Sequence, residues 1–265
     1  MNEIKKIALQ YFVRGEEKKC RCGGGHEVCL NCKICRMEGE DQTVKKITTL
    51  AEFIDHTNLK PDSISADITK LCEEAESFHF KAVCINPFFV TLCQSALKSS
   101  ASLVCSVVGF PLGANNSEIK GEETRHCIRE GAAEIDMVNN IALIKERDIS
   151  SLLSDIGIVS DICFDNDVDL KVIIETCLLT TEEKIIACLA AKKSGALFVK
   201  TSTGFSSAGA TVDDVSLMRE IVGPKLGVKA SGGVRSTDLA VKMLEAGANR
   251  IGTSNGVSIV ESFRR

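Results

Sequence analysis

The amino-acid sequence predicts a (β/α)8 TIM barrel with an N-terminal cysteine-rich extension. From residue 49 onward, eight short β-rich segments alternate with segments of helical periodicity. The roughly 215 residues involved suit one barrel of small size. We therefore place the barrel at residues 49–265 and the extension at residues 1–48. An open doubly wound sheet is the rival, but no Gly-x-Gly-x-x-Gly fingerprint follows the first predicted strand.

The predicted strands are short runs rich in apolar and β-branched residues, as expected for parallel strands that are buried on both faces. In order, they span residues 52–56, 82–86, 103–110, 134–139, 170–175, 197–201, 227–231 and 250–253. The predicted helices repeat their apolar residues at helical spacing between these runs. They span residues 65–78, 88–97, 117–130, 149–163, 181–194, 212–222 and 237–246, with a short last helix within 257–265.

Helix start and stop signals support these boundaries. The run 180–183 (Thr-Thr-Glu-Glu) offers N-caps followed by first-turn acids, and Thr211 precedes two aspartates in the same way. A glycine just past the last helical residue is a common C-terminal signal. Three predicted helices end at such glycines, namely Gly131, Gly195 and Gly247.

Composition and charge exclude several functional classes. Apolar residues make up 44% of the chain, which is enough for a large core. No apolar run approaches the ~18 residues of a membrane span, and the first residues lack the apolar segment of a secretory signal. A net charge of −4 gives no general attraction to nucleic acid or to anionic membranes. We therefore expect neither a nucleic acid nor a membrane as a partner.

The chain contains 13 cysteines, which are unevenly distributed. Eight of them stand singly within periodic apolar segments, where a free cysteine behaves as a small core residue. A disulfide framework is therefore not expected, and this cysteine usage favours the reducing environment of the cytoplasm.

The N-terminal extension has two parts. Apolar residues within 4–12 predict a short amphipathic helix. The next segment has the spacing Cys-x-Cys and then Cys-x2-Cys-x2-Cys with one histidine, which is typical of a metal knuckle because thiolates two residues apart can share a tetrahedral ion. The candidate ligands of a structural zinc are Cys20, Cys22, His26, Cys29, Cys32 and Cys35. The alternative is a flexible cysteine-rich linker that binds nothing specific.

Two lysines stand at the ends of neighbouring predicted strands. Lys200 lies in the run 197–201 and Lys229 in the run 227–231, and small residues follow each of them. In a TIM barrel the working residues come from the carboxyl ends of the strands, so the two amines would converge on one site. Considered singly, each lysine could instead extend its stem toward solvent.

Carboxylates and glycine turns complete the predicted site. Asp136 lies between apolar residues of its predicted strand, where a charge is costly unless it is paired or functional. Of the two charged residues in the run 170–175, we expect Glu175 rather than Lys171 to face the site. Glycine-rich turns follow the predicted strands six to eight, and their backbone N–H groups could hold a phosphate dianion.

Two lysines and an aspartate favour Schiff-base chemistry. A Schiff base needs a neutral amine, whereas an unperturbed lysine has a pKa of ~10.4. A second ammonium nearby disfavours protonation of the first. A carboxylate can then move protons at the carbinolamine and enamine steps. These are the requirements of a class I aldolase, which needs no metal and no other cofactor for catalysis.

Seven stretches give the chain from about residue 49 to about residue 260 a resemblance to the deoxyribose-phosphate aldolase family. They are residues 54–61 (IDHTNLKP), 82–87 (AVCINP), 107–113 (VVGFPLG), 134–139 (EIDMVN), 198–205 (FVKTSTGF), 228–235 (VKASGGVR) and 250–254 (RIGTS). The resemblance implies reversible cleavage of 2-deoxy-D-ribose 5-phosphate to acetaldehyde and D-glyceraldehyde 3-phosphate, in nucleoside catabolism. It does not reach residues 1–48.

By this resemblance, Lys200 would be the Schiff-base lysine, Lys229 the lysine that tunes it, and Asp136 the proton shuttle. Asp55 would belong to the same polar network, and Cys84 would lie near the substrate pocket, where excess aldehyde could alkylate it. The implied phosphate-binding residues are Gly204, Gly232, Gly233, Gly252 and Ser254.

Two other interpretations stay open at the level of sequence. One is a Schiff-base aldolase that acts on a different phosphorylated sugar. The other makes the barrel a passenger of its extension, which would then bind a metal or dock the enzyme to an assembly, since an amphipathic helix plus a linker is the form of a docking peptide. We also expect a homo-oligomer, either a dimer or a tetramer.

Overall fold

The computed structural model describes residues 3–12, 44 and 47–263 and contains a closed barrel of eight parallel strands. Each strand pairs with the next one along the chain, and β8 pairs with β1. The strands are β1 (Ile54–Asn58), β2 (Ala82–Ile85), β3 (Leu103–Val108), β4 (Glu134–Val138), β5 (Asp169–Ile173), β6 (Phe198–Lys200), β7 (Gly227–Ser231) and β8 (Arg250–Thr253). The predicted (β/α)8 barrel is confirmed.

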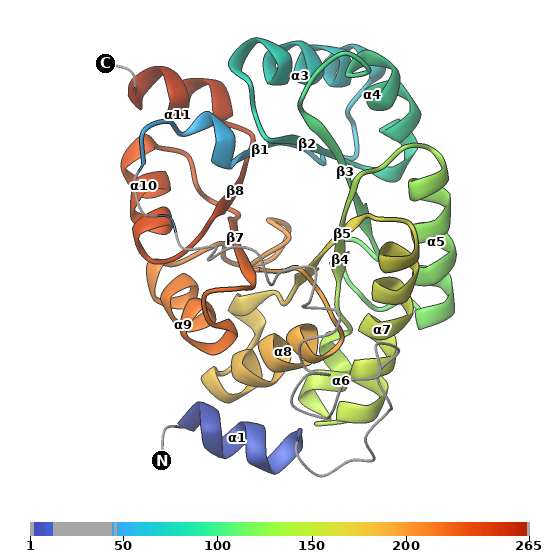
Figure 1. Ribbon diagram of the computed structural model, residues 1–265, viewed down its shortest axis with the longest axis vertical. Coiled ribbons are helices and arrows are strands. Elements are labelled where there is room, and N and C mark those ends of the chain that lie inside the picture. The colour runs from blue at the N-terminus through green and yellow to red at the C-terminus, as the bar shows by residue number, and fades with distance from the viewer. Residues whose placement is uncertain (1–2, 13–43, 45–46, 264–265) are drawn as a thin grey trace.

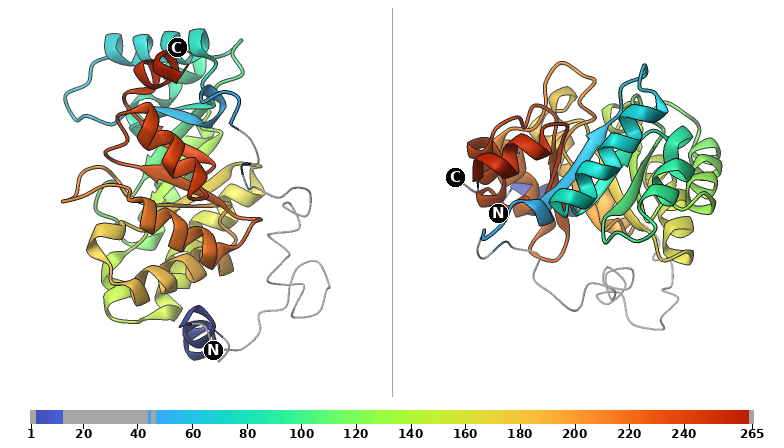
Figure 2. Two further views of the ribbon diagram at one scale, coloured as in Figure 1. Left: turned by 90° about the vertical axis from the view of Figure 1, so that its left-hand side faces the viewer. Right: turned by 90° about the horizontal axis from the view of Figure 1, so that it is seen from above.

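Helices run between consecutive strands and surround the barrel (Figures 1 and 2). They are α3 (Ser65–Phe78), α4 (Val90–Ala96), α5 (Ser117–Arg129), α6 (Ile141–Lys145), α7 (Ile149–Asp165), α8 (Thr181–Lys193), α9 (Val212–Val222), α10 (Thr237–Glu245) and α11 (Gly256–Phe263). Short 3-10 turns occur at η2 (Ala51–Phe53), η3 (Pro87–Phe89) and η4 (Thr176–Leu178). The sequence did not predict α6, a helix of five residues whose N-cap is Asn140.

The predicted helix signals form the expected caps. The N–H of Thr180 donates to Glu183 Oε2 at 2.8 Å, and the Thr180 hydroxyl accepts from the N–H of Glu183, which closes a capping box at the start of α8. The predicted stop glycines have φ values of +110° at Gly131, +86° at Gly195 and +111° at Gly247. Because other residues rarely adopt such values, glycine ends these helices at low cost.

Alternation along the strands sends one set of side chains toward the helices and the other into the barrel. Ile135 and Met137 of β4 belong to the large apolar core between strands and helices. Glu134 and Asp136, which alternate with them, therefore point into the barrel. A smaller apolar cluster around Cys84 lies on the β1 to β3 side. The barrel interior is thus divided into an apolar side and a charged side.

The N-terminal helix α1 (Glu3–Tyr11) lies outside the ring and packs against α8 (Figure 1). Its Ile7 is buried, and the Tyr11 hydroxyl donates to Glu182 Oε1 at 3.2 Å. Lys193 of α8 donates to the carbonyl of Phe12 at 2.9 Å. The helix predicted within residues 4–12 is therefore present, and its apolar face covers the barrel wall.

The six candidate zinc ligands all lie between residues 13 and 43, outside the described residues, so their role stays a prediction. The domain boundary between residues 48 and 49 also stays a prediction. Among the helices that the structure describes, none has the combination of length and apolar character that crossing a bilayer requires.

Candidate active site

Buried charged side chains from six strands meet inside the barrel. They are Asp55 on β1, Glu134 and Asp136 on β4, Lys171 on β5, Lys200 on β6, Lys229 on β7 and Arg250 on β8. The register of the strands puts neighbours side by side, because Asp136 is the ladder partner of Lys171 and Lys200 that of Lys229. In a parallel sheet such partners point to the same side. The strand pairing therefore assembles the cluster.

Asp136 is the centre of this cluster. Its Oδ2 accepts hydrogen bonds from Lys200 Nζ and Lys229 Nζ, both at 2.7 Å. Its Oδ1 accepts one from Lys171 Nζ at 2.9 Å. Burial alone would raise the pKa of the Asp136 carboxyl, but the three ammonium groups hold it well below its usual range. Asp136 is therefore an ionised group that touches both predicted active-site lysines.

Two of the three lysines have a second carboxylate partner. Lys229 pairs with Asp55, and Lys171 pairs with Glu134 Oε2 at 2.8 Å. Burial alone would lower the pKa of both ammonium groups. Asp136 and these further carboxylates outweigh burial and raise both pKa values above the usual range for lysine. Both side chains therefore remain positively charged.

Lys200 differs from them because Asp136 is its only ion-pair partner among the described residues. Its side chain is almost as deeply buried, with 3% of its surface exposed. Loss of a proton from Lys200 gives up one ion pair, whereas the other two lysines would give up two. The geometry thus singles out Lys200 as the lysine of the cluster with the fewest carboxylate partners.

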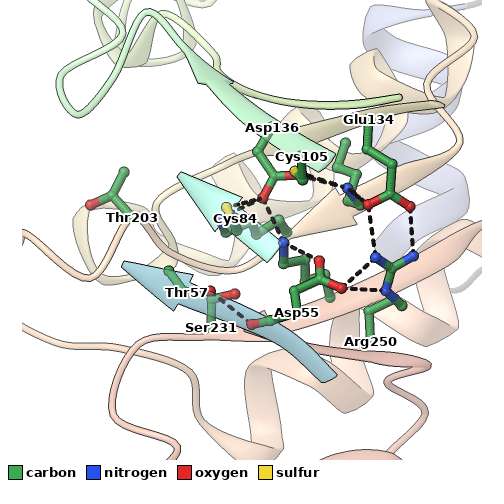
Figure 3. Close-up of polar contacts among 12 residues, drawn as sticks. Asp55, Thr57, Cys84, Cys105, Glu134, Asp136, Thr203, Ser231 and Arg250 are labelled. Carbon is green, nitrogen blue, oxygen red and sulfur yellow. Dashed lines mark hydrogen bonds and ion pairs between the residues drawn. The ribbon is translucent and has the colours of Figure 1, made fainter. Parts of the chain in front are cut away.

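A second layer of charge surrounds the Arg250 guanidinium, which lies between Asp55 and Glu134 (Figure 3). Its Nε donates to Asp55 Oδ1 at 2.7 Å, and two further nitrogens donate to the two oxygens of Glu134, both at 2.8 Å. Burial would raise the pKa of Glu134, but Lys171 and Arg250 lower it to about 2. Arg250 and Glu134 are the first residues of their strands, so this layer supports the site from the amino-terminal side of the barrel.

The prediction that Glu175 rather than Lys171 faces the site was wrong about Lys171. The Lys171 ammonium contacts Asp136 directly, as described above. Glu175 lies beyond β5 and binds the loop after β6, where its carboxylate accepts from the N–H and the hydroxyl of Thr203. Glu175 therefore holds the loop that contains Gly204, and it does not contact the lysines directly.

The sequence reasoning missed Lys171, Glu134 and Arg250. Two of them carried a usable signal. Glu134 stands two residues before Asp136, and side chains two residues apart in a strand share a face. Lys171 stands between Leu170 and Val172, and a charge inside an apolar strand needs a partner, as at Asp136. We find no comparable local signal for Arg250.

Three of the predicted phosphate-binding residues occupy left-handed turns on adjacent strands. The φ values are +87° at Gly204, +83° at Gly232 and +79° at Gly233. A Cβ atom at Gly232 would lie 3.5 Å from Gly204 Cα and 3.0 Å from Gly209 Cα. The turns after β6 and β7 are therefore in contact, and their backbones approach as closely as glycine allows.

The remaining two predicted phosphate-binding residues lie at β8. A Cβ atom at Gly252 would collide with Ser231 Oγ and lie 3.1 Å from Lys229 Cε, so a side chain at this position would have to displace these two neighbours. Ser254 is exposed in the turn between β8 and α11, and its hydroxyl lies 3.3 Å from Asn255 Oδ1. Both positions are at the carboxyl end of the barrel, on the same side as the turns after β6 and β7.

Two thiols border the same aspartate. Cys84, Cys105 and Asp136 form the one group in the described part of the chain whose ligand atoms are close enough to hold a metal ion, all within 4.8 Å of one another. Both Asp136 oxygens already bind lysine ammonium groups. A metal cation would have to displace these groups, so the cluster is better suited to moving protons than to holding a metal.

Comparison with known proteins agrees with this arrangement. A sequence model described as DeoC/LacD family aldolase matches residues 49–261. The chain is 56% identical over 214 residues to deoxyribose-phosphate aldolase 1 of Bacillus licheniformis, covering 81% of this chain and 96% of the relative. It is 54% identical over 217 residues to the deoxyribose-phosphate aldolase of Thermococcus gammatolerans, covering 81% and 96% respectively. The tetrameric deoxyribose phosphate aldolase of Aeropyrum pernix superposes with a TM-score of 0.77 at 29% identity, covering 91% of this chain and 99% of that one.

Proposed function

This chain belongs to the DeoC/LacD family of aldolases, and we propose that it reversibly cleaves 2-deoxy-D-ribose 5-phosphate into acetaldehyde and D-glyceraldehyde 3-phosphate. The observation that carries the proposal is the contact of two buried lysines, Lys200 and Lys229, with one oxygen of Asp136. Curated relatives of more than half identity are deoxyribose-phosphate aldolases, and the match spans 96% of their length. The enzyme is thus a carbon–carbon lyase of the class I type, which acts in the breakdown of deoxyribonucleosides.

We assign Lys200 as the nucleophile on the balance of charge in the cluster. Among the described residues of the barrel interior, four cationic side chains face three carboxylates, so one positive charge is in excess. Loss of one proton from the cluster removes this excess. We assign this proton to Lys200 because it has a single carboxylate partner. The charged Lys229 beside it favours the neutral amine.

Imine formation uses the three residues together. The Nζ atom of Lys200 adds to the C1 carbonyl of the open-chain sugar phosphate and forms a carbinolamine. Asp136 contacts both lysines and can relay a proton to the departing hydroxyl group, directly or through a water molecule. Water leaves and a protonated imine remains on Lys200. Its positive charge prepares the sugar for cleavage of the bond between C2 and C3.

Cleavage and release reverse the direction of proton flow. A base, Asp136 or a water molecule held by it, removes the proton of the C3 hydroxyl group. The C2–C3 bond breaks, its electrons enter the imine to give an enamine on Lys200, and D-glyceraldehyde 3-phosphate departs. Protonation of the enamine carbon and hydrolysis of the imine then release acetaldehyde and restore the amine.

We assign the phosphate to the turns after β6, β7 and β8, which contain Gly204, Gly232, Gly233, Gly252 and Ser254. These turns lie at the carboxyl end of the barrel, where phosphate sites of TIM barrels commonly form. The contact between the Gly204 and Gly232 turns places two glycine backbones next to each other, and the N–H groups of such turns can bind a dianion.

Trapping of the imine tests the assignment of Lys200. The protein is incubated with acetaldehyde and borohydride, which reduces an imine to a stable secondary amine, and the added mass is mapped by peptide mass spectrometry. We expect the adduct on Lys200, its loss in Lys200→Ala and a smaller yield in Lys229→Leu. An adduct scattered over exposed lysines, or none at all, would contradict the mechanism.

The choice of substrate needs a separate measurement. Initial rates should be compared across aldose and ketose phosphates of four to six carbons, with free 2-deoxyribose as the control for the phosphate site. The proposal requires the highest kcat/KM for 2-deoxy-D-ribose 5-phosphate. A higher value for another phosphorylated sugar would leave the Schiff-base chemistry in place and reassign the substrate.

The chain is further proposed to form a homo-oligomer, a dimer or a tetramer. The support is its likeness to the Aeropyrum pernix enzyme, whose structure is described as tetrameric. Sedimentation of the full chain at several concentrations measures the assembly directly. A monomer throughout would contradict the proposal.

Residues 1–48 are proposed to form an extension of the catalytic domain at residues 49–265, with a docking role and a structural zinc at Cys20, Cys22, His26, Cys29, Cys32 and Cys35. In this proposal catalysis itself requires no cofactor. The family match begins at residue 49, which supports the division. A cytoplasmic location is supported by the eight described cysteines, none of which forms a disulfide. Metal analysis of the full chain tests the zinc, and deletion of residues 1–48 tests the docking role through changes in localisation or assembly.

A further inference from the structure

Two buried thiols face each other across one carboxylate of the active site. Cys84 of β2 and Cys105 of β3 are ladder partners, so their side chains leave neighbouring strands on the same side. The Cys84 sulfur lies 3.9 Å from Asp136 Oδ2, and the Cys105 sulfur lies 3.1 Å from Asp136 Oδ1. The two sulfurs are within 4.8 Å of each other (Figure 3). This pair has no assigned part in the aldol reaction.

We propose that Cys84 and Cys105 form a reversible disulfide when a peroxide enters the barrel, and that this disulfide switches the active site off. Neighbouring strands are about 4.7–4.9 Å apart, and disulfides join residues whose Cα atoms are about 4.4–6.8 Å apart. A bridge between ladder partners therefore needs rotation of two side chains and no separation of the strands. The loss of activity rests on the proposed aldolase function, whereas the disulfide itself does not.

The two thiols differ in a way that suits oxidation. A hydrogen bond from Cys105 lowers the pKa of the Cys84 thiol, and the charges of Lys229 and Lys200 act in the same direction against burial. Burial raises the pKa of Cys105 well above its usual value. Of the two thiols, Cys84 therefore loses its proton more readily, and Cys105, whose sulfur also accepts from Lys171 Nζ at 3.4 Å, is its partner. This is the arrangement of an attacking thiol beside a resolving thiol.

The reaction balances with hydrogen peroxide as the only oxidant. The Cys84 thiolate attacks one peroxide oxygen, the O–O bond breaks, and hydroxide leaves, so the sulfur is oxidised by two electrons to a sulfenic acid. The Cys105 sulfur then attacks the Cys84 sulfur, the S–S bond forms and the S–O bond breaks. The proton of Cys105 passes to the departing hydroxide, which leaves as water. Asp136 lies within reach of both sulfurs and can relay this proton.

A disulfide at this place would disturb the catalytic carboxylate. Both thiols donate to Asp136 in the reduced protein, and a disulfide has no S–H to donate. Formation of the S–S bond also draws the two sulfurs together on the side of the barrel that carries Asp136. The contacts of Asp136 with Lys200 and Lys229 depend on the position of this carboxylate. The oxidised enzyme should therefore lose the geometry that forms the imine.

The experiment treats the full chain with hydrogen peroxide and measures both chemistry and turnover. Remaining thiols are alkylated in denaturant, the protein is digested without reduction, and linked peptides are identified by mass spectrometry. We expect a peptide pair joined through Cys84 and Cys105. Turnover should fall at least tenfold in the same samples and return after treatment with dithiothreitol.

Two variants separate this pair from the other cysteines of the chain. In Cys105→Ala the sulfenic acid has no resolving partner, so peroxide should cause a loss of activity that dithiothreitol does not restore, with sulfinic acid on Cys84. Cys72 and Cys93 form another hydrogen-bonded pair of buried thiols, located in α3 and α4. The matched control Cys93→Ala should respond as the unaltered protein does. Each variant is compared only with its own unoxidised form, and Cys105→Ser replaces the alanine variant if that one fails to fold.

Three outcomes would overturn the proposal. They are the absence of the linked peptide, a linked peptide with unchanged turnover, and a loss of turnover that is equally irreversible in the unaltered protein and in Cys105→Ala. Peptide mapping detects the disulfide whether or not the protein cleaves deoxyribose phosphate. A failed aldolase assay before oxidation would therefore count against the proposed function alone.

Discussion

Two buried lysine–aspartate pairs of equal length can be compared, one in the candidate active site and one outside it. Lys120 Nζ lies 2.7 Å from Asp155 Oδ2, and Lys200 Nζ lies 2.7 Å from Asp136 Oδ2. Both lysines are almost completely buried. Burial and pairing are thus shared by both sites, and the difference in function must have another cause.

The difference lies in the number of positive charges around each carboxylate. Asp155 accepts from one ammonium, from the Ser117 hydroxyl at 3.0 Å and from the N–H of Asn140 at 3.2 Å. It is a closed pair, in which one charge balances one charge. Asp136 accepts from three ammonium groups and lies in a cluster with an excess cation. A balanced buried pair stabilises the fold, whereas an unbalanced one can release a proton and do chemistry.

Replacement of the nucleophile should have the largest effect. Lys200→Met removes the only amine assigned to imine formation, so kcat should fall by roughly 10⁴-fold or more. The same change removes the excess charge, so the free energy of unfolding should stay the same or rise. Turnover assays together with urea unfolding measure both quantities. Substantial remaining turnover would contradict the assignment of Lys200.

The matched change in the Lys120–Asp155 pair should lower stability and leave turnover almost unchanged, which is the opposite of the result expected for Lys200→Met. Lys120→Met leaves Asp155 buried with no ammonium partner, and the breaking of such a pair costs about 3–5 kcal/mol of stability. The kcat of the folded fraction should change little, because Lys120 lies between α5 and α7 rather than at the lysine cluster. Unfolding by urea and turnover per folded molecule check this prediction. Equal effects of Lys120→Met and Lys200→Met on turnover would remove the distinction between the two pairs.

Removal of the neighbouring ammonium should have an intermediate effect and change the pH profile. The pKa of Lys229 is raised, so its positive charge persists through the neutral range and favours a neutral Lys200. In Lys229→Met this influence is gone. We expect kcat/KM to fall by ~10²-fold and the acid limb of its pH profile to move to higher pH. The measurement is kcat/KM from pH 5 to pH 10 for the variant and the unaltered protein. An acid limb at the same pH in both would contradict the tuning role of Lys229.

The free energy of unfolding at acid pH should reveal how much the charge layer around Arg250 and Glu134 contributes to stability. The pKa of Glu134 is about 2 in the folded protein against an ordinary value of 4.5. A lowered carboxyl pKa contributes stability above the unfolded value and loses it as the pH falls toward the folded value. This contribution, on the order of 3 kcal/mol, should disappear between about pH 4.5 and pH 2. Glu134→Gln should flatten that part of the curve, which urea unfolding at several pH values would show.

Much of the fold and part of the site could be predicted from local sequence alone. The alternation of apolar runs with helical periodicity gave all eight strands, since a parallel strand covered on both faces must be apolar along its length. Lys200, Lys229 and Asp136 stood out for the same reason, because a charge inside an apolar strand needs a partner or a task. Helix caps at Thr180 and stop glycines such as Gly131 were equally local.

The partners of these charges depended on tertiary structure. Glu134 and Lys171 are 37 residues apart in the chain, and Arg250 and Asp55 are 195 residues apart. Only closure of the barrel brings such residues into contact, and only the strand register decides which side chains share a level. The sequence alone determined the barrel, its two central lysines and the aspartate between them. The tertiary structure decided how many charges surround that aspartate, and in our proposal this number distinguishes the reactive ion pair from the structural one.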